Sequence, residues 1–307
     1  MIGSRPLMIT AFVLMMIAAV GLRLGQGPAA ASSQGAAPAP KSAPPQPKGD
    51  SAPAPLPRVL VFTKTAAFRH DSIPDGIRAV REIGAGAFEI DATEDAAAFT
   101  DDNLTRYRAV VWLSTSGEVL NDEQQAAFER YIRAGGGYAG IHAASDTEYE
   151  WPWYGKLVGA YFQTHPPVQS ATQTVEVRDH ASTRMLPERW MRTDEWYSFR
   201  SNPRGTEGIR VLMSLDESTY EPAPATMGAD HPIAWYHEFD GGRSWYTGGG
   251  HTKESFSEPL FREHLLGGIL WAAGLDSSAA PSSKPKATRG ATPSATPSAP
   301  SDGSLER

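Results

Sequence analysis

Short apolar runs alternate with helix-like patterns through residues 58–143, and this alternation constrains the fold more than any other feature. Four segments read as strands: RVLVFT (58–63), FEIDATED (88–95), YRAVVWLST (107–115) and GYAGIHA (137–143). Most of them are nearly continuous in apolar residues, as strands buried on both faces are. Strands separated by helical segments predict an α/β fold with a flavodoxin-like, doubly wound, mostly parallel sheet and helices on both faces.

Helix signals fall between these runs and near the end of the chain. Pro74 follows Ser72 at a plausible helix start, and Asn121 can cap a helix that Gly135 ends. Further strands are expected at 174–179 and 209–215, followed by a hairpin over 232–249 that turns at Asp240–Gly242. A last helix is expected over 259–274.

The two ends of the chain differ from its middle. Arg5 precedes a 16-residue apolar run, Leu7–Leu22, which is shorter than the roughly 20 residues of a membrane span. Small residues follow at Ala29–Ser32, so residues 1–31 read as a signal peptide and predict export; if uncleaved, they would tether the chain to a membrane. Residues 32–56 read as a disordered Pro/Ala-rich linker and 276–307 as a disordered tail, which leaves 57–275 as the folded domain.

Charge and cysteine content exclude some classes of function. Residues 57–275 carry 20 basic and 31 acidic side chains, a formal net charge of −11 without a basic stripe. Nucleic acid is therefore not expected as a partner, because phosphate contacts dominate such binding. The chain has no cysteine, which excludes disulfides, thiolate-bound zinc and thiol nucleophiles.

Polar residues placed just after the expected strands are the first site candidates, since ligands of parallel sheets bind beyond the carboxyl ends of the strands. A single histidine there is more often structural than catalytic. Glycines favour function for His142, which follows Gly136, Gly137 and Gly140, and for His251, which follows three glycines, because they allow close approach of the backbone. The candidates are His70, Ser116, His142 and His251, with His165, Asp194 and Glu195 in aromatic-rich loops.

The loop candidates leave several alternatives open. Asp194 and Glu195 are adjacent, so on an extended segment at most one faces the site. Neighbouring aromatic residues could grip a sugar ring or simply pack in the core: Trp151, Trp153, Trp196 and Tyr197. The remaining histidines stand in contexts that predict structural roles: His180, His231, His237 and His264.

A divalent metal ion is a further possibility, because imidazole and carboxylate groups suit zinc and other first-row ions. The candidate ligands are His142, His165, Glu195 and His251. No HExxH or HxH spacing occurs, so such a site would be assembled from distant loops. There is no GxSxG nucleophile motif, and GGGYAG precedes a strand, which is unlike a phosphate-binding loop.

Several motifs in order resemble the ThuA-like (trehalose utilisation) domain: VLVFTKTAAFRHDSI, GGGYAGIHAASD, LVGAYFQTHPP, DEWYSF, HPIAWYHEFDGGRSWYTGGGH and GGILWAAG. The resemblance covers residues 57–275 and implies a class I glutamine amidotransferase-like fold. His142 stands where that superfamily keeps its nucleophilic cysteine, so amidotransferase activity is not expected. The resemblance also implies use of trehalose or related disaccharides, glycosyl hydrolase-like activity, and functional roles for His70, His142, His165, Glu195 and His251.

The sequence thus predicts an exported carbohydrate-active protein that acts on a di- or oligosaccharide or a keto-sugar by hydrolysis, isomerisation or elimination. Glu195, or Asp194 in its place, is the expected acid or base, with His142 and His251 as proton-transfer or metal-binding partners. Glycoside hydrolysis usually needs two carboxylates, and Asp146 or Glu148 could supply the second. The alternatives are a non-catalytic sugar-binding module and a metal-dependent hydrolase.

Overall fold

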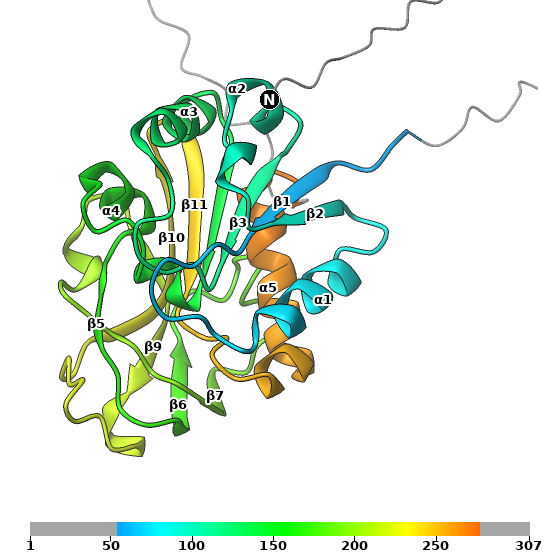
Figure 1. Ribbon diagram of the computed structural model, residues 1–307. Helices are drawn as coiled ribbons and strands as arrows, with labels where there is room; N and C mark the ends of the chain where they lie inside the picture. The colour runs from blue at the N-terminus through cyan, green and yellow to red at the C-terminus, as the bar shows by residue number, and fades with distance from the viewer. Residues whose placement is uncertain (1–53, 277–307) are drawn as a thin grey trace, which may run out of the picture. The chain divides into compact units, whose positions relative to one another are not determined.

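The computed structural model of the protein describes residues 54–276, which contain a nine-stranded mixed sheet covered by helices (Figure 1). The expected signal peptide, the linker before residue 54 and the tail after residue 276 lie outside the described residues. Within residues 54–276, no helix has the length and apolar character needed to cross a membrane.

The elements follow one another in an order that begins as a β/α alternation and continues mainly as strands. The strands are β1 (Arg58–Phe62), β2 (Glu89–Thr93), β3 (Ala109–Leu113), β4 (Gly137–Ile141), β5 (Phe162–Thr164), β6 (Gln169–Val175), β7 (Arg189–Asp194), β8 (Ser198–Phe199), β9 (Arg210–Asp216), β10 (His231–Phe239) and β11 (Gly242–Thr247). The helices are α1 (Ile73–Ile83), α2 (Asp101–Leu104), α3 (Asp122–Arg133), α4 (Pro152–Val158) and α5 (Pro259–Ala272).

The sheet has a parallel core and an antiparallel extension. Its strand order is β2-β1-β3-β4-β11-β10-β9-β6-β7. The first five strands in this order pair in parallel, and each later neighbour pairs antiparallel. The predicted α/β fold with helices packed on a parallel core is confirmed, and the sheet as a whole is mixed because only its first half is parallel.

Helices cover both faces of the core. Gly137 in β4 faces α5, since a Cβ on Gly137 would lie 2.2 Å from the carbonyl oxygen of Ala272. The next residue, Tyr138, faces the other way and its hydroxyl contacts that of Tyr154 in α4 at 2.9 Å. Successive residues of a strand point to opposite faces, so α5 and α4 lie on opposite sides of the sheet. Helix α1 packs beside α5, and α2 packs beside α3 (Figure 1).

Several elements differ from the sequence expectations, and the short α2, β5 and β8 were not expected at all. The strand expected over 174–179 is β6, which begins five residues earlier and ends at Val175. Strand β7 was not predicted, because two of the residues that face inward, Arg192 and Asp194, are charged and hide the apolar alternation. Helix α4 occupies part of a segment expected to be an aromatic loop, and it begins at Pro152, a residue suited to the first turn of a helix.

Candidate functional site

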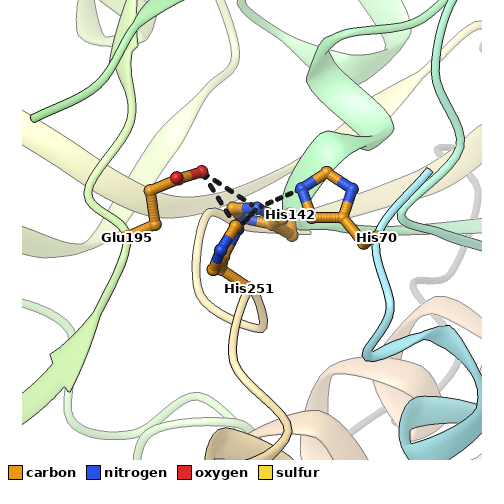
Figure 2. Close-up of side chains that lie close together, drawn as sticks. All are labelled: His70, His142, Glu195 and His251. Atoms are coloured by element: carbon orange, nitrogen blue, oxygen red, sulfur yellow. Dashed lines mark hydrogen bonds and ion pairs between the residues drawn. The ribbon is translucent and has the colours of Figure 1, made fainter. Parts of the chain in front are cut away.

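Four polar side chains from distant parts of the chain meet at the carboxyl ends of the strands (Figure 2). His70 lies in the loop after β1, His142 and Glu195 directly follow β4 and β7, and His251 lies in the loop after β11. One nitrogen or oxygen atom from each lies within 4.8 Å of those of the other three. We call this set the His/Glu cluster, and it occupies the edge where α/β sheets bind ligands.

His142 stands at the centre of the cluster on a strained turn. Its φ is +52°, in the left-handed region that residues other than glycine seldom adopt. Strain of this kind persists where the surroundings enforce it, often at functional sites. The Nδ1 atom lies 2.9 Å from the carbonyl oxygen of Gly248. A carbonyl only accepts hydrogen bonds, so Nδ1 donates and Nε2 carries the lone pair when the ring is neutral.

The Nε2 atom of His142 faces the other three members of the cluster. It lies 3.1 Å from Nε2 of His70, 3.3 Å from Nδ1 of His251 and 3.6 Å from Oε2 of Glu195. Oε2 of Glu195 also lies 3.1 Å from Nδ1 of His251. Three ring nitrogens and one carboxylate oxygen are therefore gathered around one small volume (Figure 2).

Burial and mutual charge shift the pKa values within the cluster. Burial, together with the nearby His142 and His251, lowers the pKa of His70 to about 3. Burial raises the pKa of Glu195, but its hydrogen bonds with His142 and His251 outweigh burial and hold the pKa well below its ordinary value. Burial lowers the pKa of His251, yet its contact with Glu195 leaves the pKa raised. At neutral pH, His70 is neutral and Glu195 is ionised.

Solvent reaches the cluster along one side. The side chain of His251 is 25% exposed and that of His165 is 41% exposed. Nδ1 of His165 lies 3.0 Å from Oε1 of Glu195, the oxygen that does not face the ring of His142, so His165 borders the cluster. Phe68 is 63% exposed and its ring stands edge-on to that of His70. Sequence reasoning missed Phe68, whose only signal is its place two residues before His70.

Of the two adjacent carboxylates, Glu195 enters the cluster and Asp194 supports it from behind. Asp194 is fully buried and forms an ion pair with Arg192 at 2.9 Å. Its oxygens accept hydrogen bonds from the backbone N–H groups of Glu195, Gly250 and His251. Asp194 therefore fixes the backbone at two cluster residues, which corrects its assignment as an alternative acid or base.

The aromatic residues expected to grip a sugar serve other purposes. The ring of Tyr197 packs on that of His142, with centroids 4.2 Å apart, but Tyr197 is only 3% exposed. Trp196 is fully buried and donates to the carbonyl oxygen of Gln169. The other two tryptophans, Trp151 and Trp153, stack on each other beside α3. The indole N–H of Trp151 donates a hydrogen bond to Glu129, and that of Trp153 donates one to Asp240. Asp240 precedes β11, so Trp153 lies at the opposite end of the sheet from the cluster.

The other polar candidates hold loops in place. Ser116 is buried, and its hydroxyl donates to the carbonyl oxygen of Phe68, which fastens the loop that carries His70. Glu148 is buried and accepts hydrogen bonds from the backbone of Val119 and Leu120 and from Gln125, so it does not provide a second catalytic carboxylate. Asp146 is half-buried; burial raises its pKa, and nearby His142 and His165 lower it in part.

The histidines expected to be structural have partners outside the cluster. The partners are Ser182 for His180 and His264, Glu217 and the carbonyl of Tyr197 for His231, and the carbonyl of Leu157 for His237.

The glycines before His142 leave space for neighbouring parts of the protein. A Cβ on Gly136 would meet the ring of Tyr131, and a Cβ on Gly137 would meet the backbone of α5. Their small size thus allows tight packing around β4.

Comparison with known proteins identifies the family. The ThuA family, described as trehalose utilisation, matches residues 58–272. This chain belongs to the ThuA family. No curated protein sequence matches it. Among solved structures, a ThuA-like protein from Bacteroides uniformis is 24% identical with a TM-score of 0.63, covering 75% of this chain and 96% of that protein. A ThuA-like protein from Parabacteroides merdae is 19% identical with a TM-score of 0.59, covering 75% and 94%.

These likenesses show that the fold is shared, and the parallel core with helices packed on it is consistent with the class I glutamine amidotransferase-like fold. A sharp turn follows a central strand of this sheet. That strand is β4, and the turn is occupied by His142 with φ +52°. The chain contains no cysteine, so no cysteine nucleophile stands at this turn.

Proposed function

We propose that this ThuA-family chain is an exported carbohydrate-active enzyme and that the His/Glu cluster is its catalytic centre. The family's description ties it loosely to carbohydrate utilisation. The observation that carries the catalytic part is the convergence of three imidazoles and a carboxylate at the carboxyl edge of the sheet, on a strained turn and beside solvent.

The available acid and base groups favour proton transfer on a keto-sugar over direct hydrolysis. Hydrolysis of a glycoside usually needs two carboxylates that flank the bond. Glu195 contacts three imidazoles, Glu148 is occupied by backbone groups, and Asp146 accepts a hydrogen bond from the hydroxyl of Tyr149, so each of the three candidate carboxylates already has partners. Removing a proton next to a sugar carbonyl needs one positioned base, which an imidazole supplies.

His165 is placed to be that base. Its Nδ1 lies 3.0 Å from both Oε1 of Glu195 and the carbonyl oxygen of Pro166, so Nδ1 donates and the lone pair of the neutral ring is on Nε2. The ring is 41% exposed, whereas His70 and His142 are buried. The substrate class that follows is a keto derivative of a di- or oligosaccharide, converted by isomerisation or elimination.

A product assay tests this proposal. Purified chain is incubated with a panel of disaccharides and their 3-keto forms, and the variants His142→Ala, Glu195→Ala and His165→Ala are compared with wild type. Each variant is expected to lose about 10²- to 10⁴-fold in turnover, the usual contribution of a positioned acid or base. Glu188→Gln is the control, since the Glu188 side chain is 77% exposed on the far part of the sheet.

Folding of each variant is checked by thermal unfolding. Equal turnover by wild type and all three variants would remove the cluster and the neighbouring His165 from catalysis. Saturable sugar binding with no product from any member of the panel would instead identify the protein as a sugar-binding module and overturn the enzymatic proposal.

A further inference from the structure

The donor atoms of the His/Glu cluster are arranged as cation ligands. Nδ1 of His142 is committed to the carbonyl oxygen of Gly248, so the lone pair on Nε2 faces inward. A second imidazole nitrogen, on His70, lies 3.1 Å away, and a third, on His251, lies 3.3 Å away. When the inward nitrogens carry no proton, their lone pairs repel one another and the Glu195 carboxylate, and one cation at their centre removes that repulsion.

Four of the six separations between the donor atoms are close to those around a single first-row ion, and all six are within 4.8 Å. Zinc binds imidazole nitrogen and carboxylate oxygen at about 2.0–2.2 Å in tetrahedral sites, which separates neighbouring ligand atoms by roughly 3.3–3.5 Å. The four separations that involve Nε2 of His142 or Nδ1 of His251 are 3.1, 3.3, 3.6 and 3.1 Å. Three imidazoles with one carboxylate suit zinc or a similar ion, whereas magnesium and calcium prefer oxygen ligands.

The groups around the cluster hold these donors in position, as the surroundings of a metal site do. His142 donates its other ring nitrogen to a backbone carbonyl. Asp194 binds the backbone N–H groups of Glu195 and His251. His165 contacts the second oxygen of Glu195. Nδ1 of His70 is buried with no hydrogen-bond partner among the described residues, so no hydrogen bond on the far side of this ring fixes its orientation.

We infer that His70, His142, Glu195 and His251 form a binding site for one divalent first-row metal ion, zinc being the best match. The ligand set differs from the one expected from sequence, because His70 takes the place given there to His165. The ion's role in catalysis rests on the proposed function, but its binding does not. When bound, such an ion polarises a carbonyl or hydroxyl oxygen; His165, beside the bound carboxylate, moves the proton.

Metal binding is tested without reference to activity. The full chain is stripped with a chelator and dialysed, Zn²⁺ is titrated by calorimetry, and the metal content is measured by elemental analysis. Wild type is expected to bind one ion per chain. Loss of a ligand in His142→Ala or His251→Gln is expected to weaken affinity by more than about 100-fold, beyond the usual cost of losing an outer-shell partner. His70→Ala is expected to show a smaller loss.

His165→Gln is the matched control, a histidine change next to Glu195 but outside the ligand set. It is expected to keep one ion per chain and to lose turnover. Cobalt substitution gives a second readout, since a four-coordinate ion absorbs strongly in the visible range. Failure of wild type to bind an ion stoichiometrically, or loss of the ion from His165→Gln but not from His251→Gln, would overturn the inference. An ion bound without turnover of any sugar would refute the proposed function alone.

Discussion

Asp194 and Glu195 are consecutive acidic residues whose side chains point in opposite directions, as neighbours on an extended chain do. Glu195 faces three histidines, and its Oε2 atom lies 3.1 Å from His251. Asp194 faces the interior, where every close partner is a donor: backbone N–H groups, the hydroxyl of Ser255 and the guanidinium of Arg192. Burial raises the pKa of Asp194, but Arg192 and the other donors leave it lowered, so Asp194 is ionised.

The change Asp194→Asn tests this supporting role. In either orientation of the new amide, its NH₂ group faces hydrogen-bond donors. The change also leaves Arg192 buried without its ionic partner in β7. Breaking a buried ion pair in this way is expected to lower the free energy of unfolding by about 3–5 kcal/mol. Urea denaturation measures the change. Asp101→Asn, which removes an exposed ion pair with Arg130, is the control and should cost less than about 1 kcal/mol. Equal losses in both variants would contradict the role given to Asp194.

For single residues, the sequence identifies most members of the His/Glu cluster but not the residues that surround it. His142, His251 and His70 were chosen because they follow expected strands, and all three lie in the cluster. Trp151 and Trp153 were chosen only for their residue type and nearness to a candidate loop, and the structure places them beside α3. The exchange between His70 and His165 depends on which neighbour each ring contacts: His70 contacts Nε2 of His142, whereas His165 contacts the outer oxygen of Glu195. No sequence pattern records that difference.

Strand β4 and helix α5 show at the scale of elements why small residues precede His142. The carbonyl oxygen of Ala272 lies only 2.2 Å from where a Cβ on Gly137 would stand, and that oxygen belongs to a helix backbone that has little freedom to move. A side chain at this position would push α5 away from the strand that delivers His142.

Gly137→Ala is therefore expected to destabilise the fold by about 1–3 kcal/mol, the usual cost of overpacking. Gly205→Ala is the matched control, because a Cβ there would meet nothing within 4 Å and the residue has no positive φ. That change should be neutral or slightly stabilising. The two unfolding midpoints are compared by thermal denaturation, and a Gly137→Ala midpoint at or above that of Gly205→Ala would refute the packing argument.

The parallel core could be predicted at the level of elements because β1, β3 and β4 are buried along nearly their whole length. The antiparallel extension was less accessible. Strand β6 is largely polar, and β7 turns Arg192 and Asp194 inward, so apolar periodicity gives no clear signal for either. Their charges and hydroxyls are satisfied by partners far away in the sequence, such as Ser255 and Glu258 for Arg192.

At the scale of the whole sheet, the site depends on bringing two remote strand ends together. Three strands stand between β11 and β7 in the sheet order, yet Asp194 at the end of β7 binds the backbone of Gly250, just beyond β11. The end of the antiparallel half therefore lies against the parallel core, and Glu195 lies next to the histidines. The sequence names Glu195 as a candidate by its surroundings in the chain, but how it reaches the histidines depends on the twist and pairing of many strands, which no local pattern records.

A buried histidine in α5 is expected to make the whole fold sensitive to acid. His264 in α5 is fully buried; its Nδ1 donates to the carbonyl oxygen of Ser182, and its Nε2 has no partner among the described residues. Burial lowers the pKa of His264 to about 3, against a hydrogen bond to Ser182 that raises it in part. In the unfolded chain the group titrates near its ordinary value of about 6.5.

Between these two values the unfolded state binds a proton that the folded state does not, so stability falls as pH drops from about 6.5 toward 3. One such proton contributes a slope of up to about 1.4 kcal/mol per pH unit. His264→Phe keeps an aromatic ring among Trp245, Trp190 and Phe261 and removes the titration. The variant is expected to be less stable at pH 7, where Ser182 loses its donor, and to show a shallower decline in urea midpoint below pH 6.5. Parallel profiles for the two proteins would assign the acid sensitivity to other groups.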